Sequence, residues 1–183
     1  MENWQISEKQ KELLDNLFEK IGLNNIKNVL DVGSGRTSIG YLTDRFKDLM
    51  ITGVVHPDDE QRIQKIKDSI INQNYEILRT DINDLNKDQN FDIILAHLFL
   101  GEATKFSGNN FENILENLLA IKTKYLILVN VSYDDAISYF YLLKRIAQCG
   151  EIVGLGYAPS SEDNDPREKF GGGCVGLCIK FHD

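Results

Sequence analysis

This sequence lacks most of the features that mark secreted and membrane-spanning chains. No apolar run reaches the roughly 18 residues that a membrane span needs. The N-terminal residues MENWQISEKQ have neither the basic nor the apolar region of a secretory signal. Three cysteines, Cys149, Cys174 and Cys178, are too few for a disulfide framework. These absences predict a cytoplasmic chain without a membrane segment.

Positive charge is also in short supply. The chain has 20 Lys and Arg against 28 Asp and Glu, which gives a formal net charge of −8. The average electrostatic field therefore repels phosphate polyanions, and a nucleic-acid partner is not expected. The short basic cluster of Arg62, Lys65 and Lys67 fits the solvated face of a helix better than a binding patch.

The chain contains no internal repeat and no interdomain linker. A length of 183 residues suits one domain with a core large enough to fold alone, so we predict a single domain over residues 1–183. Residues 1–22 should include an N-terminal helix that packs on the sheet or caps the site. Ser7 and Gln10 have the spacing of a capping box, and apolar residues recur on one helical face after them.

Apolar strands alternate with amphipathic helices through most of the chain. The segments VLDV, FDIILA and YLILVN are continuous apolar runs, which are typical of parallel strands covered by helices on both faces. The pattern predicts strands at 28–32, 51–55, 75–80, 91–97 and 125–130, and helices at 37–48, 58–73, 110–122 and 134–148.

The C-terminal part breaks this alternation. Residues 150–157 and 172–181 are two strand-like segments with no helix between them, so they should form an antiparallel hairpin. The acidic connection at 158–171 is long, and loops of that length are usually mobile or functional. The predicted fold class is therefore α/β, with a doubly wound, mostly parallel seven-stranded sheet that ends in an antiparallel C-terminal hairpin.

The segment NVLDVGSGRTSIGYL, residues 28–42, joins an apolar strand to a helix through a glycine-rich turn. Such a turn points backbone N–H groups at the crevice beside it and suits an anionic ligand group. Asp31 precedes the first glycine, where its carboxylate would repel a pyrophosphate but could hold an ammonium, directly or through water. The ligand that fits carries both a carboxylate and an amine.

With this turn and the terminal hairpin, the chain resembles the Rossmann-like (class I) S-adenosylmethionine-dependent methyltransferases. Asp31, Gly33 and Gly35 match the family's glycine motif, with Ser34 between the glycines. Thr37 takes the place of the third glycine, where it could cap the helix. The resemblance implies S-adenosyl-L-methionine as cofactor and a small molecule or a protein as methyl acceptor, and it leaves homo-oligomerisation open.

The resemblance also implies a ribose contact after the second strand. An acid at the end of that strand binds the ribose hydroxyls in the family, but Val55 stands at this position. Valine accepts no hydrogen bond, so the contact is either lost or supplied by His56, Asp58 or Asp59.

A further cofactor contact is implied after the third strand. Asp81 stands where an acid accepts a hydrogen bond from the adenine amino group, and Ile82 can pack on the ring. The alternative interpretation of Asp81 is a simple loop acid, and Asp84, one turn further, fits a solvated residue.

The reacting region is expected at the end of the fourth strand. His97 has a suitable intrinsic pKa for a general base near neutral pH, and Glu102 could bind a substrate amine or hydroxyl. The alternatives are a histidine that only packs at the strand end and a glutamate that caps a turn. No metal site is expected, because Cys174, Cys178 and His182 do not have a zinc-binding spacing.

Three functions therefore remain open. The first is methyl transfer from S-adenosyl-L-methionine to a small-molecule or protein substrate. The second is a catalytically degenerate methyltransferase-fold binding or scaffold protein, motivated by Val55 and the missing third glycine. The third and most distant is an NAD(P)-binding oxidoreductase, because Ser38 stands where the dinucleotide fingerprint has a glycine.

Overall fold

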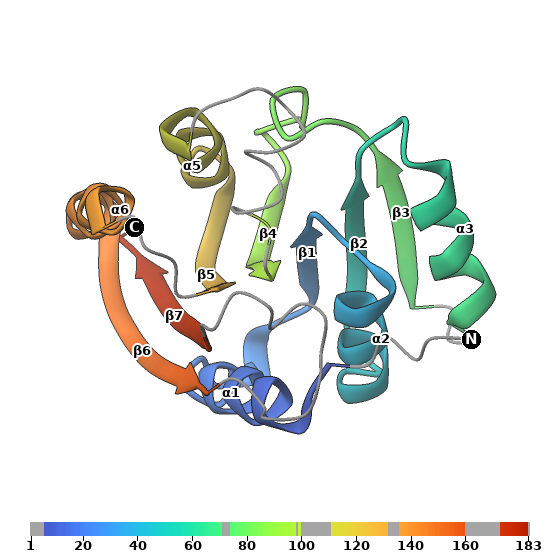
Figure 1. The fold of residues 1–183 in the computed structure, drawn as a ribbon, viewed down its shortest axis with the longest axis horizontal. Coiled ribbons are helices and arrows are strands. Elements are labelled where there is room, and N and C mark those ends of the chain that lie inside the picture. The colour runs from blue at the N-terminus through green and yellow to red at the C-terminus, as the bar shows by residue number, and fades with distance from the viewer. Residues whose placement is uncertain are drawn as a thin grey trace.

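Seven strands form one sheet in the order β3-β2-β1-β4-β5-β7-β6, with β3 and β6 at its edges (Figure 1). The computed structural model describes residues 6–70, 74–97, 99, 111–131, 136–159 and 173–182. The parallel strands are β1 (Asn28–Val32), β2 (Met50–Val55), β3 (Tyr75–Arg79), β4 (Asn90–His97) and β5 (Lys122–Val131).

The C-terminal hairpin forms one end of the open sheet, as predicted. β7 (Cys174–Phe181) runs antiparallel to both β5 and β6 (Gly150–Ala158) and lies between them. This topology confirms the α/β fold class, including the antiparallel end of a mostly parallel sheet.

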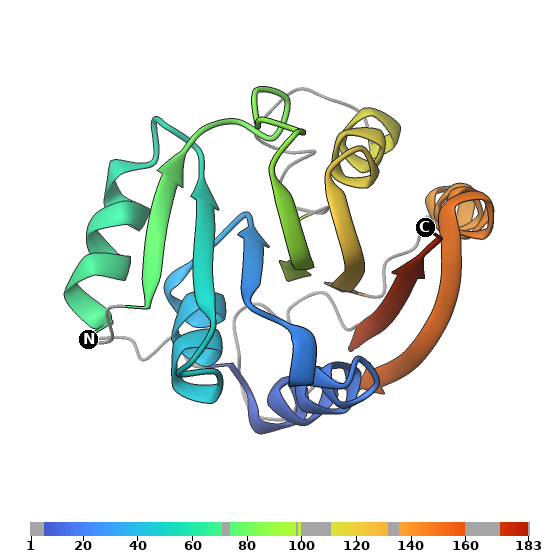
Figure 2. The same ribbon diagram turned by 180° about the vertical axis from the view of Figure 1, so that it is seen from behind.

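Helices cover both faces of the sheet (Figures 1 and 2). Val29 and Leu30 are neighbours on β1 and point to opposite faces, and each belongs to a different apolar cluster. The clusters explain why the strands have continuous apolar sequences rather than alternating ones. On the Val29 face lie α1 (Glu8–Glu19), α2 (Arg36–Arg45) and α3 (Glu60–Ser69), and on the Leu30 face lie α5 (Phe111–Leu119) and α6 (Ala136–Cys149).

Most element types were predicted correctly, but several boundaries were not. α3 begins at Glu60 because Asp59 caps it, accepting a hydrogen bond from the Arg62 N–H at 3.0 Å. β5 begins at Lys122, three residues before the predicted start at 125, because Lys122 pairs with Asn90 of β4. Sheet pairing therefore extends the strand back to Lys122, the residue at which the sequence pattern ended the preceding helix.

α1 packs on β6 and β7, the two strands of the C-terminal hairpin. A short 3-10 turn (Leu23–Asn25) follows it before β1. Ser7 accepts a hydrogen bond from the Gln10 N–H at 3.3 Å, so Ser7 caps the helix as predicted. Leu13 and Leu17 lie directly on Gly176 of β7, where an added Cβ would stand 2.7 Å from Leu17. The glycine is therefore what allows the helix to approach the strand so closely.

The described residues contain neither a helix that could cross a membrane nor a candidate metal centre. No helix there is long and apolar enough to span a bilayer, and no group of three or more His, Cys, Asp or Glu side chains there is arranged to hold a metal ion. Cys174 and Cys178 form no disulfide and are buried in one core cluster, as their spacing on a strand predicted.

Gly40 offers a simple test of how α2 is packed. It lies inside the helix, and nothing stands within 4 Å of the position of an added Cβ. Because glycine in a helix interior costs about 0.5–1 kcal/mol relative to alanine, Gly40→Ala should raise the free energy of unfolding by about that amount. Urea denaturation at pH 7 measures the change, and a loss of stability would show that the helix has no room at this position.

Candidate functional site

A cavity of about 560 Å³ lies at the carboxyl ends of β1, β2 and β3. This is the edge at which open parallel sheets bind their ligands, and the volume is in the range of small-molecule sites. Gly33 and polar residues from the β2–α3 connection, the first turn of α3 and the β3–β4 connection form the rest of the wall. The apolar part of the wall consists of Val32, Val54, Val55, Ile82 and Phe99.

The glycine turn after β1 forms one end of the cavity. Gly33 lines the cavity and has φ +70°, a conformation that favours glycine. The Ser34 N–H donates to the Val54 carbonyl at 2.8 Å and so fixes the turn to β2. The Asp31 Oδ2 atom accepts hydrogen bonds from the hydroxyls of Ser34 at 2.5 Å and Ser38 at 2.6 Å. Asp31 therefore ties the turn to the first turn of α2.

The carboxyl group of Asp31 is completely buried. Burial raises its pKa from the ordinary value of 3.8 to about 7, and the hydrogen bonds from Ser34 and Ser38 offset only part of this effect. Asp31 is not among the residues that line the cavity. The sequence suggested that this carboxylate could hold a ligand's ammonium, directly or through water, and that role stays a prediction. In the structure the Asp31 carboxylate lies inside the turn and accepts the hydrogen bonds of Ser34 and Ser38.

The start of α2 differs from the prediction. Gly35 is the N-cap residue, and its N–H donates to the Ser38 hydroxyl at 3.2 Å. The prediction that Thr37 caps the helix is wrong, because the helix begins at Arg36 and a cap has to precede the first helical residue. Ser38, at the position where a dinucleotide fingerprint has glycine, takes part in this capping.

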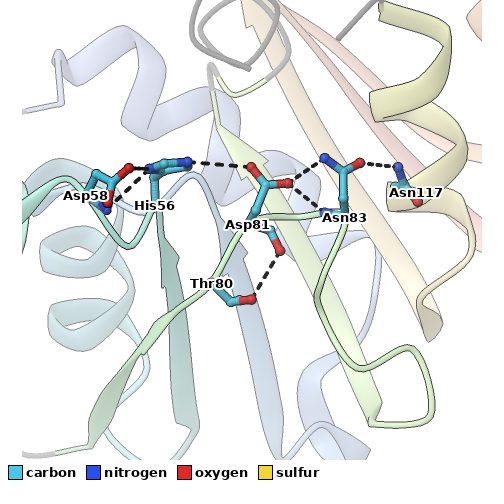
Figure 3. Close-up of polar contacts among 6 residues, drawn as sticks. All are labelled: His56, Asp58, Thr80, Asp81, Asn83 and Asn117. Carbon is cyan, nitrogen blue, oxygen red and sulfur yellow. Dashed lines mark hydrogen bonds and ion pairs between the residues drawn. The ribbon is translucent and has the colours of Figure 1, made fainter. Parts of the chain in front are cut away.

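His56, Asp58 and Asp81 come together at the rim of the cavity (Figure 3). The Nε2 atom of His56 lies 3.7 Å from Asp81 Oδ2, and its Nδ1 atom accepts a hydrogen bond from the Asp58 N–H at 3.3 Å. The His56 side chain is half exposed, so a ligand can reach it. Ile82, next to Asp81, is buried in the cavity wall. The structure thus gathers four residues that the sequence assigned to cofactor contacts.

Two asparagines that sequence reasoning missed hold Asp81 in place (Figure 3). The Asp81 Oδ1 atom accepts hydrogen bonds from the Asn83 backbone N–H at 2.8 Å and side-chain amide at 2.6 Å. The Asn83 Oδ1 atom in turn accepts from the Asn117 amide of α5 at 2.6 Å. Asp81 followed two residues later by Asn83 has the spacing of an Asx turn, which is the one local signal for this arrangement.

The side chain of Val55 offers no hydrogen-bond acceptor at the end of β2. Its side chain is 1 % exposed and packs in the cluster with Ile63 of α3. Of the neighbouring carboxylates, Asp59 already caps α3 and pairs with the Arg62 Nε atom at 2.9 Å. The side chain of Asp58 is 91 % exposed. Asp58 is therefore better placed than Asp59 to serve a ligand.

Phe99 is a cavity residue that the sequence analysis did not identify. Its side chain covers Gly33, since a Cβ added to that glycine would stand within 3.2 Å of three Phe99 carbon atoms. Phe99 is far from Gly33 in the sequence, and no local motif marks the contact.

Of the two predicted catalytic residues, the structure describes only His97. His97 is the last residue of β4, pairs in register with Val129, and is 9 % exposed. It is not among the lining residues. Glu102 and most of the loop at 158–171 lie outside the described residues. Their catalytic and lid functions stay predictions.

The rim of the cavity carries an excess of negative charge. Arg62 is paired with Asp59, and Glu60 is paired with Arg79 at 2.6 Å. Asp58 and Asp81 add two further carboxylates, with His56 between them. Such a rim favours a cationic ligand and opposes a pyrophosphate.

No protein-family model matches the chain, and no curated protein matches it. The fold is similar to that of solved methyltransferase structures. The N-methyltransferase NodS from Bradyrhizobium japonicum WM9, in complex with S-adenosyl-L-homocysteine, has a TM-score of 0.66 and 12% identity, over 96% of this chain and 88% of that chain. The plantazolicin methyltransferase BpumL, also with S-adenosyl-L-homocysteine, has a TM-score of 0.66 and 16% identity, over 95% and 85%.

A third structure, a putative class I S-adenosylmethionine-dependent methyltransferase from Listeria monocytogenes, has a TM-score of 0.67 and 16% identity. The match covers 96% of this chain and 60% of that chain. At these identities the likeness establishes that the chain has the methyltransferase-like Rossmann fold.

Proposed function

We propose that this chain binds S-adenosyl-L-methionine in the cavity at the carboxyl ends of β1, β2 and β3, and transfers its methyl group to a small molecule or a protein. The observation that carries the proposal is the cavity itself, which combines apolar walls with the rim of His56, Asp58 and Asp81. It lies on a fold shared with methyltransferases that were crystallised with S-adenosyl-L-homocysteine.

The residues present fit the nucleoside half of this cofactor. Ile82 and Val54 supply apolar surface for the adenine ring. Asp81, held by Asn83, is proposed to accept the hydrogen bond from the adenine amino group. His56 and Asp58 are proposed to serve the ribose hydroxyls in place of the acid that the end of β2 lacks.

The turn of Gly33, Ser34 and Gly35 and the first helical turn, which contains Thr37, are proposed to face the amino-acid half of the cofactor. Asp31 then acts as a positioning residue, because its hydrogen bonds to Ser34 and Ser38 fix the turn. The helix N-terminus at Arg36 favours a carboxylate nearby.

Bound cofactor supplies a methyl group on a positively charged sulfonium. Its transfer is an in-line displacement, whose barrier falls mainly through the positioning of the reactants. The carboxylates of the rim favour the positive charge, and a base is needed only when the acceptor must lose a proton. His97 and Glu102 remain the proposed catalytic residues, because His97 ends β4 at the same edge of the sheet and Glu102 comes five residues later in the sequence.

The proposed methyl acceptor is a small molecule or a protein, and not a nucleic acid. Structures of BpumL include complexes with desmethylPZN analogs, so the shared fold accommodates acceptors of that kind. The formal charge of −8 disfavours nucleic acids.

Thermal denaturation with a ligand panel tests the proposed function. S-adenosyl-L-homocysteine at about 100 times its Kd should stabilise the chain by about 2.7 kcal/mol, which for a chain of this size is about 5–10 °C in Tm. A shift with NAD⁺ or NADP⁺ alone would favour an oxidoreductase instead. No shift with any of these ligands would favour a scaffold protein.

Replacing Asp81 with alanine should weaken the binding of S-adenosyl-L-homocysteine by about tenfold to a hundredfold, because the adenine amino group of the bound ligand is then left without its hydrogen-bond acceptor. Isothermal titration calorimetry measures the change. Asp84→Ala is the matched control, since it removes the same charge from an exposed position of the same connection. Equal losses in the two variants would contradict a direct contact with Asp81.

A further inference from the structure

The cavity has two chemically different ends. His56, Asp58 and Asp81 stand at the carboxyl ends of β2 and β3. Gly33 and Phe99 stand at the carboxyl end of β1, and Gly33 is close in sequence to the N-terminus of α2. A nucleoside suits the first end, with its acceptors and apolar walls. The carboxylate of an amino-acid tail suits the second end, because the helix N-terminus lies there.

The ring of Phe99 occupies the position at which a side chain on Gly33 would project. The Cγ, Cδ2 and Cβ atoms of Phe99 all lie within 3.2 Å of where a glycine Cβ would stand. The side chain is half-buried and packs against the core cluster that contains Val32 and Ile82. The packed ring therefore has favourable van der Waals contacts. A ligand group that needs the same space has to displace the ring and lose those contacts.

We propose that Phe99 is a specificity-determining residue that covers the amino-acid-tail end of the cofactor site. The proposal rests on the proposed function. The amino-acid tail of the cofactor and the Phe99 ring cannot occupy the space beside Gly33 at the same time. The chain therefore discriminates weakly between S-adenosyl-L-homocysteine and 5′-methylthioadenosine, which keeps the nucleoside and the thioether but has no tail.

Isothermal titration of both ligands into the wild-type chain and the Phe99→Ala variant tests this proposal. The readout is the ratio of the two dissociation constants, Kd for 5′-methylthioadenosine over Kd for S-adenosyl-L-homocysteine. Phe99→Ala should raise this ratio by about tenfold, since displacing a half-buried ring costs a ligand affinity of that order. The ratio should rise through tighter binding of S-adenosyl-L-homocysteine. Affinity for the tailless ligand should stay within about threefold.

Two further variants make the result interpretable. Phe181→Ala removes a ring from the same core cluster, and Phe181 does not line the cavity, so it should leave the ratio unchanged. Phe99→Leu keeps an apolar wall with a smaller side chain and should raise the ratio part of the way, even if the alanine variant does not fold.

A ratio that stays the same or falls in both Phe99 variants, while both ligands bind, would overturn the role of Phe99 and leave the proposed function intact. Failure of both ligands to bind both the wild-type chain and the Phe99 variants would instead reject the cofactor site.

Discussion

The stability gained by replacing Asp31 with asparagine should rise by about 2–3 kcal/mol between pH 5 and pH 8. The reason is the buried carboxyl group, whose pKa burial raises from 3.8 to about 7 in the folded chain. Asparagine keeps an oxygen that can accept the hydrogen bonds of Ser34 and Ser38, but it cannot ionise.

The sign follows from the direction of the pKa shift. Because the folded chain binds this proton more tightly than the unfolded chain, the stabilisation that protonated Asp31 contributes is complete below about pH 3.8. It is lost as the pH rises through about 7, the pKa of Asp31 in the folded chain. At pH 8 the folded wild-type chain holds a buried carboxylate that asparagine removes. Any pH-independent cost of the buried amide cancels when the two pH values are compared.

Urea denaturation of both proteins at the two pH values measures this difference. Asp84→Asn controls for the loss of one negative charge, because Asp84 is exposed. If the stability difference between wild type and Asp31→Asn did not change with pH, the Asp31 carboxylate would have to be solvated or paired with a cation, contrary to its complete burial.

Gly33→Val should have the second large effect, on both stability and ligand binding. Gly33 has φ +70°, which a β-branched residue adopts only with strain, and the new side chain would overlap Phe99. We expect a loss of about 2–4 kcal/mol in the free energy of unfolding. The Tm shift caused by S-adenosyl-L-homocysteine should disappear, because the side chain blocks the approach of a ligand to the backbone.

Gly22→Val is the matched control for this variant. Gly22 has φ +69°, the same type of backbone conformation, but nothing lies within 4 Å of its Cβ position. It should therefore lose only the part of the stability that comes from backbone strain, about 1–2 kcal/mol, and keep the ligand-dependent shift. A Gly33→Val protein that folds and keeps the full ligand shift would show that the ligand does not lie at the glycine turn.

The fold was largely predictable because its signals are local. Continuous apolar runs such as FDIILA predicted buried parallel strands, and two strand-like segments without a helix between them predicted the antiparallel hairpin. The start of α2 was not predictable in the same way. The local pattern allowed a cap at Thr37. In the structure Gly35 is the N-cap residue of α2, and its N–H donates a hydrogen bond to the Ser38 hydroxyl.

The site was predictable only where its residues follow the strands directly. His56 and Asp81 come after β2 and β3, and parallel strands bring such residues to one edge. Asn117 reaches Asn83 from α5, 34 residues away, and Phe99 covers Gly33 from beyond β4. These contacts depend on how distant elements pack, which no local pattern records. The burial of Asp31 likewise depends on α2 closing over the turn.

Isothermal titration of S-adenosyl-L-homocysteine into the wild-type chain tests the central claim most directly. We predict saturable binding of one ligand per chain, with a dissociation constant in the micromolar range and a negative heat-capacity change from burial of the apolar wall. Absence of saturable binding with millimolar ligand would contradict the claim that this cavity holds the cofactor.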